Sequence, residues 1–128
     1  MNLLIDTHVF LWWASNPDRL SDRVRRAIAD PGNRVIVSAV SAWEIAIKAS
    51  LGRLGLPEPA DRYIASRMDD NSFVPLAFTM EHSLRTASLP DLHRDPFDRA
   101  LVAQAVVERI PIATADRLVS GYSVEVVW

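Results

Sequence analysis

Four acidic residues lie where short apolar runs give way to helix-like segments: Asp6, Glu44, Asp98 and Asp116. A fold that brings them together would create one dense carboxylate cluster. Like charges a few ångströms apart repel and raise one another's pKa values, so such a cluster stabilises a fold poorly. Mg²⁺ or Mn²⁺ would remove this cost, because both ions prefer hard oxygen ligands. Two such ions about 4 Å apart can activate a water and stabilise a leaving oxygen in phosphoryl chemistry.

Each acid also has a local role that would explain it alone. Asp6 and Asp116 can cap the helices that follow them. Glu44 can close a capping box from Ser41 or pair with Lys48 one turn later. The remaining acid lies in the first turn of a late helix, where it complements the helix dipole. These roles give no reason for four acids to converge at one end of a sheet, so the sequence favours a shared site.

Short apolar runs alternate with amphipathic segments along the chain, which predicts an α/β fold with a central, mostly parallel sheet flanked by helices. The predicted strands cover residues 2–6, 34–38, 73–76, 110–114 and 123–127. The predicted helices cover 7–14, 21–30, 41–51, 60–68, a segment capped by Thr79, and 97–108 with Asp95 as N-cap. Functional groups of open parallel sheets gather beyond the carboxyl ends of the strands, where all four acids are expected.

Length and composition limit the remaining possibilities. At 128 residues, 49% hydrophobic and 23% charged, the chain has the size and balance of one globular domain over residues 1–128. It has no cysteine, which excludes disulfides, thiolate metal sites and cysteine nucleophiles. Three histidines without a His-x-x-x-His spacing do not predict a zinc site. No basic leader or membrane-length apolar run is present, so we expect a cytoplasmic protein without membrane contact.

The order and spacing of four blocks resemble those of PIN domains, and in particular the VapC-type toxins of bacterial toxin–antitoxin pairs. The blocks are residues 4–8, Ser38 with residues 43–45, residues 95–105, and residues 114–116. The resemblance extends over the whole chain and implies a PIN-like nuclease domain. It makes the four acids the family's metal-binding catalytic set, with up to two Mg²⁺ or Mn²⁺ ions. Candidates for contacts to the substrate or to these acids are Thr7, Ser38, Asp95, Arg99 and Thr114.

The same resemblance implies an endoribonuclease that leaves a 3′-hydroxyl and a 5′-phosphate and is neutralised by a cognate antitoxin. It also implies a homodimer. Asp95 lies close to Asp98 and can cap the helix or reach a metal-bound water, and we favour Asp98 as the ligand. Arg99 can meet a substrate phosphate, although a solvated or carboxylate-paired arginine is the simpler interpretation.

Other functions stay open beside this one. An RNA-processing PIN nuclease without an antitoxin, or a catalytically silent PIN-like interaction module, has the same pattern. A phospho-acceptor receiver module would need a mid-chain aspartate at a strand end and a late lysine. This chain has Ser38 at its second strand end and no lysine after Lys48. Adjacent Trp12 and Trp13 cannot both face one core, so one can meet an antitoxin helix unless the core and a dimer contact absorb both.

Overall fold

The computed structural model describes residues 1–128 and is built around one five-stranded sheet. The strands are β1 (Asn2–Ile5), β2 (Arg34–Ser38), β3 (Val74–Leu76), β4 (Ile112–Ala113) and β5 (Val126–Val127). They lie in the order β3-β2-β1-β4-β5, and every pairing is parallel. The predicted α/β fold with a parallel sheet is therefore confirmed, and the carboxyl ends of all five strands lie along one edge.

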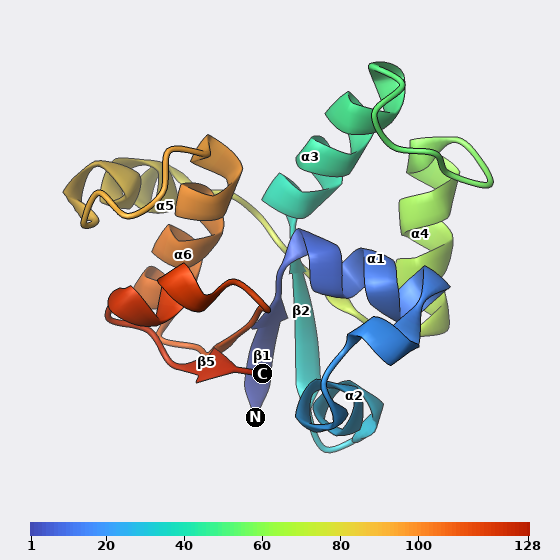
Figure 1. The fold of residues 1–128 in the computed structure, drawn as a ribbon, viewed down its shortest axis with the longest axis horizontal. Helices are drawn as coiled ribbons and strands as arrows, with labels where there is room; N and C mark the ends of the chain where they lie inside the picture. The colour runs from blue at the N-terminus through green and yellow to red at the C-terminus, as the bar shows by residue number, and fades with distance from the viewer.

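Six α-helices and three short 3₁₀ segments connect these strands. The helices are α1 (Thr7–Ser15), α2 (Asp22–Ala29), α3 (Ala39–Ser50), α4 (Ala60–Asp70), α5 (Met80–Arg85) and α6 (Pro96–Glu108). The 3₁₀ segments are η1 (Pro17–Arg19), η2 (Thr86–Ser88) and η3 (Arg117–Gly121). In Figure 1, α5 and α6 lie on one side of β1 and β2, whereas α1, α2 and α4 lie on the other. None of the helices combines the length and the apolar character that crossing a membrane requires.

Alternating side chains of the strands feed two cores, one on each face of the sheet. Leu3 and Ile5 of β1 point into the core shared with α1, α2 and α4. Leu4 between them points into the core shared with α6 and η3. This two-sided burial follows from the period of two along a strand and explains the nearly continuous apolar composition of the strands. Helix α3 extends from the end of β2 between the two sets of helices (Figure 1) and contributes Val40 to one core and Ile45 to the other.

The start of α3 differs from the sequence prediction. The Ser38 hydroxyl accepts a hydrogen bond from the Val40 backbone amide at 2.9 Å and caps the helix. The capping box predicted from Ser41 to Glu44 is therefore wrong, and the helix begins at Ala39. Ser38 takes the cap because it is the last extended residue of β2, so its side chain reaches the first free amides directly. Glu44 consequently lies in the second turn of the helix.

Four strands are shorter than predicted, whereas the helix ends agree within one or two residues. The predicted strands 2–6, 73–76, 110–114 and 123–127 are reduced to β1, β3, β4 and β5. The amide of Ile110 closes the end of α6 by donating to the Ala105 carbonyl, and Pro111 has no amide to donate to the ladder. The Ile110 amide is therefore used by the helix end, whereas the Pro111 carbonyl still accepts from the Leu4 amide of β1.

Candidate active site

The candidate site begins with three polar residues that end neighbouring strands. Ile5 pairs with Val37 on one side and with Ala113 on the other. The next residues along these strands, Ser38, Asp6 and Thr114, therefore form a row at the carboxyl edge, with Asp6 in the middle. The parallel register positions them together, because all three chains leave the sheet at the same level.

Asp6 is held in a defined orientation at the start of α1. Its Oδ1 accepts a hydrogen bond from the Val9 amide at 2.8 Å, so the helix-capping role is confirmed. Burial raises the pKa of Asp6, and nearby Glu44 raises it further. Hydrogen bonds from Thr114 and Val9 act in the opposite direction without cancelling the effect of burial. This carboxylate is thus costly to ionise unless a cation approaches it.

Glu44 lies on α3, close enough for its charge to act on Asp6, and is 5% exposed. The Lys48 Nζ donates to Glu44 Oε2 at 2.5 Å, which confirms the pairing one helical turn apart. The hydrogen bond to Glu44 raises the pKa of Lys48, with smaller contributions from Asp95 and Asp98. Lys48 therefore neutralises part of the negative charge of these acids, as a bound metal ion would.

Asp98 is a carboxylic acid whose pKa lies well above its ordinary value. Burial raises its pKa to about 6, and the negative charges of Asp95, Glu44 and Asp116 add to the effect. Residue His93 opposes it. These influences link acids from α3, α6 and the loop after β4, so segments far apart in the sequence meet at one place. A divalent cation would relieve the repulsion that burial here makes costly.

Asp116 is held on both carboxylate oxygens. Its Oδ1 accepts from the Leu118 amide at 2.9 Å and caps η3, and His93 Nε2 lies 2.7 Å from its Oδ2. Burial raises the pKa of Asp116, but the hydrogen bonds from His93 and Leu118 outweigh it, so the pKa lies below its ordinary value. Asp116 and Asp98 thus have pKa values displaced in opposite directions.

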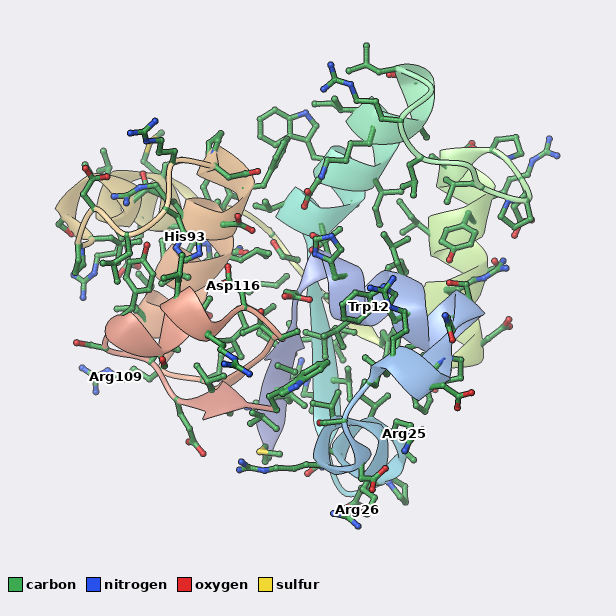
Figure 2. The ribbon with its side chains drawn as sticks, in the orientation of Figure 1. Trp12, Arg25, Arg26, His93, Arg109 and Asp116 are labelled. Atoms are coloured by element: carbon green, nitrogen blue, oxygen red, sulfur yellow. The ribbon has the colours of Figure 1, made fainter.

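His93 is the residue that the sequence did not reveal as part of the site. It is 8% exposed, and its ring atoms lie with the carboxylates of Asp98 and Asp116 in a group whose donor atoms are all within 4.8 Å of one another. Figure 2 shows His93 and Asp116 side by side. Asp6 and Glu44 lie outside this tight group, although the charge of Glu44 reaches both Asp6 and Asp98. The one available sequence signal was the position of His93, five residues before Asp98 in the distinctive third block.

Two of the accessory candidates stabilise the frame of the site. The Thr7 hydroxyl donates to the Ser41 hydroxyl at 2.9 Å and thereby joins α1 to α3. Ser38 donates to the Gln104 side chain in α6 while it caps α3. All four side chains are buried. These contacts hold α1, α3 and α6 in register around the acids.

The third block also contains two residues with local structural roles. Asp95 is exposed, and its Oδ1 accepts from the Phe97 amide at 2.8 Å, so its N-cap role is confirmed. The Arg99 side chain is half-buried, and its guanidinium has no ion pair with a carboxylate. It donates instead to four backbone carbonyls of the preceding loop, those of Thr86, Leu89, Pro90 and His93. Arg99 is therefore committed to loop structure rather than presented to a phosphate.

A cleft of 290 Å³ adjoins the acids between α1 and α3. Its polar lining includes His8, Glu44, Lys48 and Arg53, and its apolar wall includes Trp12. Trp12 is half-buried beneath the Arg19 guanidinium, 4.3 Å from the ring centre. The cleft thus combines two basic side chains with an aromatic wall next to the carboxylate cluster.

Both tryptophans of α1 are half-buried, so neither stands free of the protein. Trp13 donates its indole N–H to Asn71 Oδ1 at 2.9 Å. Trp12 lies 6.4 Å from Trp128 and 5.6 Å from His8, measured between ring centres. Both tryptophan rings are thus partly covered by contacts within this chain.

A known family model matches nearly the whole chain that builds this site and fold. The model described as "PIN domain" matches residues 3–122. The chain belongs to the PIN domain family. The predicted family resemblance is thereby confirmed.

Individual members of the family resemble the chain to different extents. Ribonuclease VapC22 of Mycobacterium tuberculosis is 29% identical over 90% of this chain and 87% of its own length. Ribonuclease VapC16 of the same organism is 39% identical over 48% of this chain, and the match spans only 44% of that relative. Among solved structures, the PIN fold is similar to a chain of Rickettsia felis VapBC2 bound to promoter DNA, with TM-score 0.70, 13% identity and 98% and 97% of the two chains covered. A chain of DNA-bound VapBC from Salmonella typhimurium gives TM-score 0.67, 13% identity and 98% and 96% coverage.

Proposed function

We propose that this PIN domain is a metal-dependent endoribonuclease toxin of the VapC type, neutralised by a cognate VapB-type antitoxin. The observation that carries the proposal is a linked set of acids in a PIN fold: Asp98 and Asp116 lie in one tight group, and the charge of Glu44 acts on both Asp98 and Asp6. Similarity to two ribonucleases named VapC supports the activity, and similarity to VapBC structures supports the antitoxin partner.

The donor set suits a hard divalent cation such as Mg²⁺ or Mn²⁺, up to two of them. Carboxylate oxygens dominate it and no thiolate is present. Burial, with a further contribution from neighbouring acids, raises the pKa values of Asp6 and Asp98, and a cation would offset this cost of ionisation. We assign Asp6, Glu44, Asp98 and Asp116 as the residues that hold it. A cation bound there lowers the pKa of water and neutralises charge on the leaving oxygen.

The chain's own side chains supply orientation and charge balance. Val9 and Thr114 orient Asp6, while Leu118 and His93 orient Asp116. Lys48 and Arg53 line the adjoining cleft and would bind the RNA backbone as it approaches the acids. Lys48 also pairs with Glu44, so the side chain that would bind the RNA backbone also neutralises part of the charge of the acidic cluster.

The activity is tested with purified protein on structured and unstructured RNA, with Mg²⁺ or Mn²⁺ and with chelator. Cleavage should need the metal and leave a 3′-hydroxyl and a 5′-phosphate. Asp6→Asn should reduce it by at least about 100-fold while the protein stays folded, because the reaction depends on the missing ligand. An exposed acid away from the edge, Asp61→Asn, serves as the matched control. Full cleavage by the Asp6 variant would refute the assignment.

The antitoxin is tested genetically and biochemically. A short upstream reading frame that encodes a DNA-binding protein should yield a product that binds this chain and blocks cleavage. Its absence would shift the assignment to an RNA-processing PIN nuclease. We also propose that the chain forms a homodimer, which light scattering on the purified protein measures directly.

A further inference from the structure

His93 occupies a buried position between two other side chains of the site. Its ring stacks on that of Tyr122, with centres 5.5 Å apart and planes 18° apart. The Tyr122 hydroxyl lies 2.8 Å from His93 Nδ1, and Asp116 Oδ2 lies 2.7 Å from His93 Nε2. Each ring nitrogen of His93 therefore has a hydrogen-bond partner, Tyr122 for Nδ1 and Asp116 for Nε2.

The hydrogen-bond partners determine the tautomer of the neutral ring. An ionised carboxylate only accepts, so the Nε2 nitrogen that faces Asp116 must carry the hydrogen. Nδ1 is then the acceptor, and the Tyr122 hydroxyl donates to it. Asp116 thus sets the tautomer of His93, and Tyr122 supports it by donating to Nδ1.

The result is a carboxylate that cannot rotate freely. Leu118 holds one oxygen of Asp116 and His93 holds the other. The closest other acid, Asp98, offers its oxygen within 4.8 Å of both His93 and Asp116. The separation of the two carboxylates therefore depends on where His93 places Asp116.

Two further contacts hold the loop that carries His93. Arg99, one residue after Asp98, donates to the His93 carbonyl and to three earlier carbonyls of the loop. Leu92 packs onto Gly121, where an added Cβ would come within 2.6 Å of Leu92 Cδ1. The loop that carries His93 is thus held from two sides, by Arg99 next to Asp98 and by Gly121 after Asp116.

We propose that His93 is a positioning residue for the catalytic acid Asp116, supported in its donating tautomer by Tyr122, and that this pair sets the metal affinity of the site. The inference rests on the proposed nuclease function for its catalytic meaning. Partners that orient a metal-binding side chain typically change metal affinity by roughly 10- to 100-fold when removed. Since both nitrogens already have partners, His93 acts through Asp116 rather than on the metal itself.

A pair of variants isolates the hydrogen bond from the volume of the ring. His93→Leu keeps an apolar side chain but cannot donate, whereas His93→Gln offers an amide N–H in place of Nε2–H. Mn²⁺ titration by calorimetry should show a roughly 10- to 100-fold loss of affinity in His93→Leu and a substantial recovery in His93→Gln. Tyr122→Phe should lower the affinity in the same direction. Tyr63→Phe, a buried tyrosine of the opposite core, should leave it unchanged.

Thermal unfolding and RNA kinetics complete the test. All variants should unfold cooperatively, and kcat should fall in His93→Leu while KM for RNA stays constant. Wild-type Mn²⁺ affinity in both His93→Leu and Tyr122→Phe would overturn the inference, as would equal losses in the leucine and glutamine variants. A nitrogen bound directly to Mn²⁺ in pulsed electron paramagnetic resonance would also overturn it. Wild-type protein that binds Mn²⁺ without cleaving RNA refutes the nuclease proposal, while the metal affinities still decide the role of His93.

Discussion

Replacing Asp98 with asparagine should stabilise the metal-free protein at neutral pH and abolish RNA cleavage. Burial and the neighbouring acids raise the pKa of Asp98 from 3.8 to about 6. Its ionised form is therefore less favourable in the folded state than in the unfolded state. Above the folded pKa this acid lowers the free energy of unfolding, and asparagine removes that penalty.

The sign of the pH dependence follows from the two protonation states. Below about pH 4 Asp98 is protonated in both folded and unfolded chains, so it costs nothing. The penalty develops as the pH rises from 4 to 6 and is complete above the folded pKa. The advantage of the asparagine variant should therefore be full at pH 7.5 and disappear toward pH 4. The lowered pKa of Asp116 stabilises the folded protein at pH values above the ordinary pKa of an aspartate. This contribution is lost only as the pH falls below the range from 4 to 6, and it is lost in wild type and variant alike.

The magnitude can be bounded from the same shift. Two pKa units correspond to an upper limit of about 3 kcal/mol, which solvent screening of this half-buried group reduces to about 1.5–2 kcal/mol. Asparagine also loses the favourable interaction of a carboxylate with the start of α6, about 0.5 kcal/mol. The net gain is about 1 kcal/mol, or roughly 3–5 °C in Tm for a chain of this size.

Urea and thermal unfolding in chelator at pH 7.5, 6 and 4.5 measure this directly, with the exposed Asp91→Asn as control. Adding Mn²⁺ should raise the Tm of wild type and leave that of the Asp98 variant nearly unchanged, because only the wild type binds it tightly. A variant that is no more stable than wild type at pH 7.5, or a gain as large at pH 4.5 as at pH 7.5, would refute the reasoning.

Three other substitutions test separate parts of the site. Lys48→Gln leaves the buried Glu44 without its partner, so the metal-free protein should lose about 1–2 kcal/mol, and Mn²⁺ should raise its Tm more than that of wild type. Ser38→Ala removes the cap of α3 and the link to Gln104, which should cost about 1–2 kcal/mol in urea unfolding, and a change below 0.3 kcal/mol would contradict that role. Arg99→Lys cannot reach four carbonyls, so amide exchange in residues 86–93 should accelerate and kcat should fall. A higher KM for RNA with normal exchange would instead indicate a phosphate contact.

Local sequence patterns predicted most of the helices and strands correctly, whereas the metal-binding role of the four acids stays a prediction. The alternation of apolar strands with amphipathic helices, the Asp95-Pro96 start of α6 and the Thr79 cap all depend on neighbours in the chain. The Ser41 capping box failed because two serines near the strand end had compatible patterns. The structure decided between Ser38 and Ser41, because β2 ends at Ser38 and α3 begins at the next residue.

The site likewise combines features that the sequence predicts with contacts that only the tertiary structure decides. That Asp6 and Asp116 follow apolar strands, and that Glu44 and Asp98 lie near the starts of helices, is evident from the sequence, because short-range apolar periodicity and capping residues mark where these elements begin and end. The tertiary structure decided which side chains touch. His93 reaches Asp116 and Tyr122, 23 and 29 residues away, and Arg99 turns from a possible phosphate contact into a loop clamp. Such roles depend on strand order, sheet register and loop packing, which arise from contacts between distant segments and leave no periodic trace in the chain.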